Sequence, residues 1–155
     1  MARRLSVFLV LLALAAARAE EPAEVGSVLG RGERVVLSVW GHDAEARVRV
    51  VFPPLQEYQD LTLEQWQKFK GYYRTAARRL ERLQPEEASY VGKVGRLHVG
   101  CDYPRAGRFP GKNVVIYLVL EDNRNQGIHL DDDGRRDIEE LMRKVDARLG
   151  VAEDE

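Results

Sequence analysis

The sequence predicts an α+β domain in which a four-stranded antiparallel sheet carries two helices on one face. Two observations lead to this class. Runs of β-branched residues alternate with polar ones at the two-residue period of strands, and two longer segments repeat apolar residues at the helical period. These segments follow one another in the order β-β-α-β-β-α, which favours two packed layers.

A separate segment precedes this domain. It begins with the basic residues Arg3 and Arg4, continues with an uncharged apolar run, and ends with small residues at Ala17 and Ala19. This pattern is typical of a signal peptide that is cleaved after Ala19. The apolar run is shorter than the roughly 20 residues that span a membrane, so no stable membrane span is expected after cleavage. We therefore expect an exported protein, either periplasmic or secreted.

Charge and cysteine content narrow the function. The 155 residues include 24 basic and 25 acidic ones, and cleavage would remove three arginines, leaving 21 against 25 and a formal net charge of −4. An acidic domain is unlike a general nucleic-acid-binding protein, so no nucleic-acid partner is expected. Cys101 is the single cysteine, so the core must stabilise the domain without an internal disulfide.

The domain is expected to open with a hairpin. Residues 34–40 and 44–52 are rich in valine and are separated by a Gly-His-Asp turn, while Pro53 ends the second strand. The polar, glycine-rich residues before this hairpin favour a flexible leader. The expected divisions of the chain are the signal peptide (1–19), the leader (20–32), a single α+β domain (33–150) and an acidic tail (151–155).

A capping signal marks the start of the first helix. Thr62 followed by Gln65 forms the pattern of a capping box, in which each side chain bonds the backbone amide of the other residue. Apolar residues then recur at helical spacing until Pro85 prevents continuation. The stripe consists of Leu63, Trp66, Phe69, Tyr73, Ala76, Leu80 and Leu83.

A second hairpin is predicted from residues 95–101 and 113–120, joined by a long connection at 102–112. Every residue from Val114 to Leu120 is aliphatic or aromatic. Such an uninterrupted run favours a central strand that is covered on both faces.

The acidic stretch after this strand resembles a calcium-binding loop. Counting the loop from Asp122 places Gly127 and Asp133 at the sixth and twelfth positions, which suit that motif. The same count puts Arg124 at the third position, where an oxygen ligand is needed. A calcium-stabilised module is therefore an alternative rather than the main interpretation.

A helix start explains more of these residues. Residues 125–127 suit a turn, Asp131 suits an N-cap, and the two following aspartates suit the positive end of a helix dipole. We predict a helix from about 132 to 149 with Gly150 as its C′ residue. Its buried stripe consists of Ile138, Leu141, Met142, Val145 and Leu149.

The two halves of the domain are similar under a shift of 69 residues. This shift lays five residues of the first helix, Phe69, Tyr72, Tyr73, Ala76 and Leu80, on five of the last helix, Ile138, Leu141, Met142, Val145 and Leu149. It also places Val48 and Val50 on Tyr117 and Val119. An internal ββα duplication is one explanation, and the general similarity of amphipathic helices is the other.

Catalytic and metal-binding patterns are weak. His98 and Cys101 form an H-x-x-C sequence, but residues three apart in a strand point to opposite faces, so Cys101 is expected to be a buried hydrophobe. Three scattered histidines and one cysteine do not form a zinc pattern, and no phosphate-binding loop is present. We predict no cofactor and no metal. A small exported hydrolase that uses Cys101 or carboxylates is the alternative function.

Two surfaces are candidates for binding. The first is the 102–112 connection, which exceeds the usual length of a hairpin loop and combines aromatic and basic residues, the types that anchor protein interfaces. Its candidate residues are Tyr103, Arg105, Arg108, Phe109 and Lys112. The alternative is an ordinary solvated loop.

The second candidate surface is the sheet face opposite the helices. Alternation places Arg47 and Arg49 on that face, and Arg96 and His98 on the same face of the third predicted strand. If these strands are neighbours, they form a basic stripe, although a wet outer face is the ordinary structural explanation. The sequence thus predicts a non-enzymatic exported domain that binds a protein or an anionic envelope component through the loop, this face or both, with self-pairing into a homodimer as an alternative.

Overall fold

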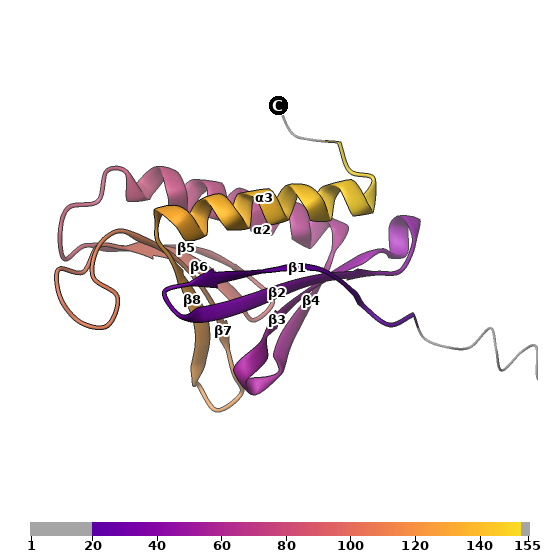
Figure 1. The fold of residues 1–155 in the computed structure, drawn as a ribbon, viewed down its shortest axis with the longest axis horizontal. Coiled ribbons are helices and arrows are strands. Elements are labelled where there is room, and N and C mark those ends of the chain that lie inside the picture. The colour runs from indigo at the N-terminus through magenta and orange to yellow at the C-terminus, as the bar shows by residue number, and fades with distance from the viewer. Residues whose placement is uncertain (1–19, 153–155) are drawn as a thin grey trace, which may run out of the picture.

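The structure is a computed structural model that describes residues 20–152, so the predicted signal peptide and the end of the acidic tail lie outside the described residues. It contains two four-stranded antiparallel sheets and two long helices that lie side by side in one layer (Figure 1). The α+β class is therefore confirmed. The single four-stranded sheet and the order β-β-α-β-β-α are wrong, because four strands precede each helix.

Sheet A has the strand order β1-β2-β3-β4. The predicted hairpin corresponds to β2 and β3, which pair with Leu37 opposite Val50. Residues of the expected flexible leader instead form β1, whose Val28 is 3 % exposed and belongs to the core. The strands are β1 (Ala23–Gly30), β2 (Glu33–Trp40), β3 (Arg47–Phe52) and β4 (Glu57–Thr62), with short 3-10 turns η1 (Asp43–Glu45) and η2 (Pro53–Leu55).

Sheet B has the strand order β5-β6-β7-β8. The second predicted hairpin corresponds to β6 and β7, with His98 opposite Tyr117. The turn expected at residues 125–127 is wrong, since these residues begin β8. The strands are β5 (Ala88–Val94), β6 (Leu97–Asp102), β7 (Asn113–Val119) and β8 (Asn125–Leu130).

Strand β7 is central in sheet B, but it is not covered on both faces as predicted. Ile116 and Leu118 are buried on the core side, whereas Tyr117 and Val119 are half-exposed on the outer face. Since Val48 and Val50 face the core, the strand part of the 69-residue alignment, which pairs them with Tyr117 and Val119, is wrong as well.

The two predicted helices are confirmed. Helix α2 spans Leu63–Leu80, and the capping box between Thr62 and Gln65 is present in both directions. Helix α3 spans Asp132–Leu149, with the Asp131 carboxylate accepting from the Gly134 amide at 3.0 Å and Gly150 in the left-handed conformation after the last turn. Neither of these helices is long and apolar enough to cross a membrane.

Each helix packs mainly on the sheet of the other half of the chain. Helix α2 follows sheet A but lies against β5 and β6, and α3 follows sheet B but lies against β1 and β2 (Figure 1). The two helices run antiparallel, because Trp66 near the start of α2 bonds Asp146 near the end of α3. The halves are thus interlocked around one shared core.

A glycine beside a β-bulge lies under each helix. The register shifts next to Gly26 in β1 and next to Gly92 in β5. A Cβ atom at Gly26 would lie 2.8 Å from Leu141 of α3, and one at Gly92 would lie 2.7 Å from Tyr72 of α2. Side chains of the helices therefore rest directly on the backbone of the first strand of each sheet.

A buried polar cluster joins the two helices. The Asp146 carboxylate accepts from the Trp66 indole at 2.7 Å and from the Lys70 ammonium at 2.6 Å. Lys70 is 2 % exposed and Asp146 is 6 % exposed. Because both carboxylate oxygens are bonded, the charges are paired inside the core rather than solvated.

Replacing Gly92 by alanine should destabilise the fold, because the added methyl group would meet the Tyr72 ring. We expect the free energy of unfolding to fall by about 1–3 kcal/mol, the usual cost of overpacking. Urea unfolding measures this change. Gly71→Ala is the matched control, since a Cβ at Gly71 in α2 meets open space, and it should stabilise the protein by up to about 1 kcal/mol. Equal stability of the two variants would contradict the close contact.

Candidate functional site

The 103–112 connection is an ordered loop. Asn113 is fully buried, and its side-chain amide lies within 3.0–3.1 Å of three acceptors, Asp102 Oδ1, Phe109 O and Gly111 O. The Gly111 amide also donates to the Pro104 carbonyl at 2.8 Å. The backbone of the loop is therefore held from inside, and its conformation does not depend on its exposed side chains.

The predicted binding residues of this loop separate into two groups. Arg105 and Arg108 are exposed, and the Arg108 guanidinium lies 5.0 Å from the centre of the Phe109 ring. Tyr103 and Lys112 instead turn towards the body of the protein, where Lys112 lies over the Tyr103 ring and donates to the Glu81 carbonyl at 3.3 Å. The first group is thus available at the surface.

Phe109 brings the loop onto sheet B by stacking on His129 of β8, with a centroid distance of 4.2 Å. The ring nitrogen Nδ1 of His129 and its backbone amide both lie 2.9 Å from Glu33 Oε2. This double contact holds the imidazole in place. His129 therefore forms a fixed support for the tip of the loop.

More aromatic rings continue across the outer face of sheet B. His98 stacks on Tyr117 at a centroid distance of 5.1 Å and lies 5.8 Å from Tyr90. The Tyr90 hydroxyl and His98 Nδ1 are 3.2 Å apart, and Tyr90 is 54 % exposed. We call this surface the aromatic face; it consists of Tyr90, His98, Phe109, Tyr117 and His129.

A shallow hollow of about 210 Å³ lies in this face. Its floor is Gly100, where a Cβ atom would lie 2.9 Å from the Ser89 carbonyl, and its walls include Tyr90, Val115 and Tyr117. The cavity is smaller than the roughly 300–1,000 Å³ typical of pockets for drug-sized ligands. Its size suits a single side chain.

The environment of His98 favours the neutral imidazole. Desolvation by burial lowers the pKa of His98 below its ordinary value, and the positive charge of Lys93 lowers it further. Desolvation likewise raises the pKa of the Tyr117 phenol. The central rings of the aromatic face are therefore uncharged near neutral pH.

Cys101 lies behind this face, on the core side of β6. It is 3 % exposed, and burial raises the pKa of its thiol. Both properties disfavour the thiolate that a nucleophile needs. The expectation of a buried, hydrophobic cysteine is confirmed.

The predicted basic stripe is divided between two sheets. Arg47 and Arg49 lie on β3 of sheet A, whereas His98 lies on β6 of sheet B and Arg96 lies in the turn before it. Arg49 is paired with both oxygens of Asp60 at 2.7 and 2.9 Å and lies 3.9 Å from the centre of the Tyr58 ring.

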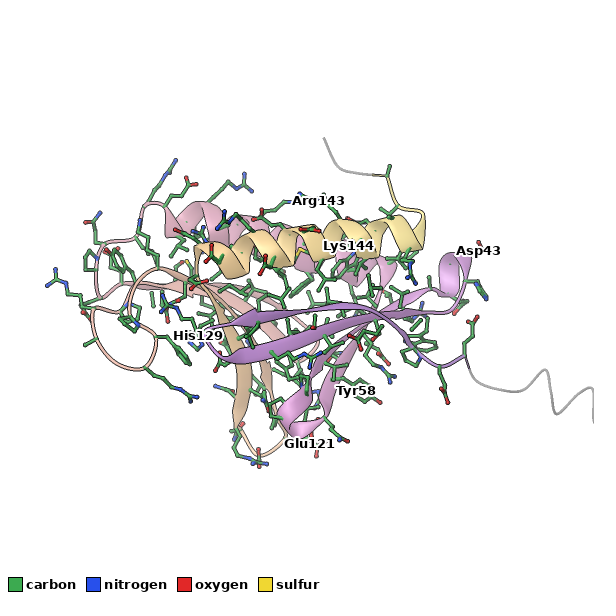
Figure 2. All side chains as sticks on the ribbon, in the orientation of Figure 1. Asp43, Tyr58, Glu121, His129, Arg143 and Lys144 are labelled. Carbon is green, nitrogen blue, oxygen red and sulfur yellow. The ribbon has the colours of Figure 1, made fainter. Side chains whose placement is uncertain are left out.

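The other two arginines are engaged as well. Arg96 donates to the Tyr58 carbonyl at 2.8 Å, and Arg47 donates to the Ala46 carbonyl at 2.9 Å. Tyr58 is well separated from His129 and the loop (Figure 2). The structure thus brings His98, Arg108 and Phe109 to sheet B, leaves Arg47 and Arg49 on sheet A, and directs the Arg96 side chain from the β5–β6 turn to β4 of sheet A.

Sequence reasoning missed several members of the aromatic face. Tyr90 lies in β5, which was not recognised as a strand, and Tyr117 was assigned to a strand covered on both faces. His129 lies in β8, whose first residues were expected to form a turn. In β5 a bulge after Tyr90 breaks the two-residue period, so that Tyr90 and Lys93, three residues apart, both lie on the outer side. Local alternation therefore gave no signal for this strand.

The acidic stretch is used structurally. Asp131 caps α3, while Asp132 and Asp133 pair with Arg135 and Arg136 in the first turn. Among residues 20–152, no three His, Cys, Asp or Glu side chains gather in a group that could hold a metal ion. The N-cap prediction is confirmed.

The sequence matches no protein-family model and no curated protein. The function is therefore inferred from the geometry of the described residues.

Replacing Asn113 by alanine should loosen the loop and destabilise the protein, because three partly buried acceptors lose their donor. We expect a loss of about 1–3 kcal/mol in the free energy of unfolding. Amide hydrogen exchange at Gly111 should become faster. The exposed Asn125 provides the control, as its replacement by alanine should change stability by about 0.5 kcal/mol or less. Unchanged exchange at Gly111 in Asn113→Ala would show that the clamp does not hold the loop.

The titration of His98 should differ between the folded and unfolded protein. Since the pKa is lower in the folded state than the ordinary 6.5, the unfolded state binds more protons just below pH 6.5. The free energy of unfolding should therefore rise as pH increases through this window. NMR titration should give His98 a lower midpoint than a peptide of the same sequence. His98→Gln should lack the corresponding pH dependence of stability, and an unaltered dependence would assign it to other groups.

Proposed function

We propose that this chain is an exported binding domain that recognises a protein partner through the aromatic face and the exposed part of the 103–112 loop. Export rests on the signal-peptide pattern of residues 1–19. Protein recognition rests on one observation above all. The outer face of sheet B carries stacked, partly exposed aromatic rings instead of the polar residues usual on the wet face of an antiparallel sheet.

The chemistry of this face suits a protein. Tyrosine and arginine are the residue types that most often contribute large shares of binding energy at interfaces. Tyr90 and Tyr117 supply tyrosines at the hollow above Gly100, and Arg108 supplies an arginine beside Phe109 in the loop. The hollow is the size of one apolar side chain, so a partner would insert such a side chain between the two tyrosine rings.

Charge favours an acidic partner. Arg105, Arg108 and Lys93 are exposed around the aromatic face, although the chain from residue 20 onwards is acidic overall. A basic rim around an aromatic centre speeds encounter with an acidic surface and disfavours basic partners. An anionic envelope polymer shares this charge, but it offers no apolar side chain for the hollow.

The alternative functions have less support. A hydrolase based on Cys101 would need a reachable thiolate, whereas this thiol is buried and its pKa is raised. A calcium-stabilised module would need the acidic stretch as a loop, whereas β8 passes through it and Asp131 is used as a cap. We therefore retain the binding domain as the proposed function.

We also infer that the two halves arose by duplication of a unit of four strands and a helix. The support is positional. Strand pairing makes Gly26 and Gly92 equivalent, since each follows a bulge in the first strand of its sheet. Their helix contacts, Leu141 and Tyr72, are 69 residues apart, which is the shift that aligns α2 with α3.

The proposed function predicts that binding depends on the aromatic face and not on tyrosine exposure in general. The exported protein would be used as bait for the extracellular and envelope fractions, and a captured partner would then be titrated in purified form. Tyr90→Ala should weaken binding by about 30-fold or more, the size of a hot-spot loss. The double variant Arg108→Ala, Phe109→Ala should weaken it comparably.

Tyr58→Ala is the matched control, because Tyr58 is also exposed (42 %) but lies on the outer face of sheet A. It should leave the affinity within about twofold of the native protein, as expected for a residue outside the interface. Equal losses for Tyr58→Ala and Tyr90→Ala would contradict the proposed surface. If the bait captured an anionic polymer and no protein, the partner would be an envelope component instead of a protein. If it captured a second copy of this chain, the surface would form a homodimer.

A further inference from the structure

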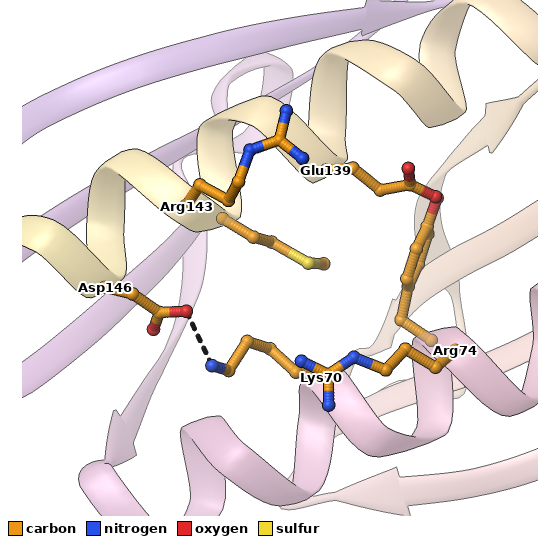
Figure 3. A pocket seen from close by; sticks show the side chains of 7 residues that line it. Lys70, Arg74, Glu139, Arg143 and Asp146 are labelled. Carbon is orange, nitrogen blue, oxygen red and sulfur yellow. Dashed lines mark hydrogen bonds and ion pairs between the residues drawn. The ribbon is translucent and has the colours of Figure 1, made fainter. Parts of the chain in front are cut away.

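A cleft of about 460 Å³ lies between α2 and α3, in the helix layer, whereas the aromatic face lies on sheet B. Its walls come from both helices. Arg74 of α2 and Arg143 of α3 stand on opposite sides, with the Lys70–Asp146 pair at one end and Glu139 at the other (Figure 3). The cleft thus lies on the seam where the two halves of the chain meet.

The two walls are built from equivalent positions. The shift of 69 residues that aligns α2 with α3 places Arg74 on Arg143 and Tyr73 on Met142. Both arginines are exposed, whereas Tyr73 and Met142 are buried. Each wall of the cleft therefore combines an exposed guanidinium with a buried, largely apolar side chain.

The floor carries a buried cation. The Lys70 ammonium has three hydrogen-bond donors, and among the described residues Asp146 is the acceptor that it meets, at 2.6 Å. Its second contact is the face of the Trp66 ring at 5.8 Å, which accepts no conventional hydrogen bond. Lys70 is one of the residues that line the cleft, so donors remain for an acceptor placed there.

The far end of the cleft holds a hydrogen-bonded carboxylate. The Tyr73 hydroxyl donates to Glu139 Oε1 at 3.0 Å, and desolvation followed by the charge of Glu139 raises the pKa of Tyr73, so the phenol keeps its proton. Asp146 is paired with Lys70 and also accepts from the Trp66 indole. The lining of the cleft thus combines three cationic side chains, Lys70, Arg74 and Arg143, with two carboxylates that each accept from a neighbouring side chain.

We propose that this cleft binds a small organic anion whose carboxylate or phosphate group lies between Arg74 and Arg143 and accepts from Lys70. Guanidinium groups bind such oxyanions through two parallel hydrogen bonds, and two of them on facing walls can hold one group from both sides. The volume falls within the usual range for small-molecule sites. The Tyr73 ring and the Met142 thioether would contact an apolar part of the same ligand.

This site is independent of the protein-binding surface and has its own test. The ¹⁵N-labelled protein, purified after export, would be titrated with inorganic phosphate, phenyl phosphate and benzoate, and with sodium chloride at matched ionic strength. We expect amide shifts concentrated in α2 and α3 around the cleft. The two phosphates and benzoate distinguish phosphate from carboxylate ligands, and phenyl phosphate should bind more tightly than inorganic phosphate because of the apolar wall.

Charge variants on the surface of the two helices sharpen the test. Arg74→Gln and Arg143→Gln should each weaken binding about tenfold or more, the size of a lost charge-assisted hydrogen bond. Lys144→Gln, next to Arg143 but paired with Glu140 outside the cleft, removes the same charge and should change affinity about twofold or less, since exposed charges act weakly through water. Glu139→Gln should strengthen binding.

Several outcomes would overturn the proposal. These are equal weakening by Lys144→Gln and Arg143→Gln, identical shifts with sodium chloride, shifts located away from the cleft, and no shifts with any of the three probes. Lys70 is left unaltered in this design because its replacement would expose Asp146 as an unpaired buried charge. The surface variants avoid that complication, so a loss of binding reports on the site rather than on the fold.

Discussion

The buried contact of Lys70 and Trp66 with Asp146 is the interaction on which the arrangement of the two halves depends. It joins the first turns of α2 to the last turn of α3. Because each helix covers the sheet of the other half, fixing the helices also fixes the two sheets. Burial of an ion pair is costly and adds little net stability, but a slide of one helix past the other would leave a buried charge unpaired. The pair therefore selects one register of the helices over its neighbours.

The edges of the sheets are protected in the same reciprocal way. Glu33 of the first half accepts from the His129 amide of β8, and Arg79 of the first half donates to the Tyr90 carbonyl of β5. Arg96 of the second half donates to the Tyr58 carbonyl of β4. Charged side chains at strand edges discourage pairing with other chains. Here each half shields the other, so the interlocked arrangement provides edge protection as well as a core.

The parts of the fold that follow local rules could be predicted from the sequence. Both helices begin at capping residues, Thr62 and Asp131, whose side chains bond the amide three residues later. The strands β2, β3, β6 and β7, which have a clear apolar pattern, were also found. The strands that were missed contain polar residues and glycines, such as Gly26 and Gly92, whose role is to receive a helix from the other half. That role depends on a long-range contact and leaves no local pattern.

The candidate site likewise has parts that follow local sequence patterns and parts that depend on long-range contacts. The loop with Arg108 and Phe109 was evident from its length and composition, but its support, His129, lies in a strand that resembled a turn. The stripe of basic residues failed because adjacency of strands was assumed, whereas Arg49 and His98 belong to different sheets. The alternation within one strand shows which of its side chains share a face. Which strands combine their faces into one surface depends on the order of all strands in the sheets.

The one strand whose pattern conflicts with its environment is the most informative for function. Strand β7 is apolar or aromatic from Val114 to Val119, which is typical of a strand covered on both faces, yet Val115, Tyr117 and Val119 are half-exposed on the outer side. A sheet that needed only to be soluble would carry polar residues at these positions. A partner that covers the outer face would explain why β7 is apolar on both sides although its outer side is half-exposed in this chain. Binding of a partner to the aromatic face would provide that cover.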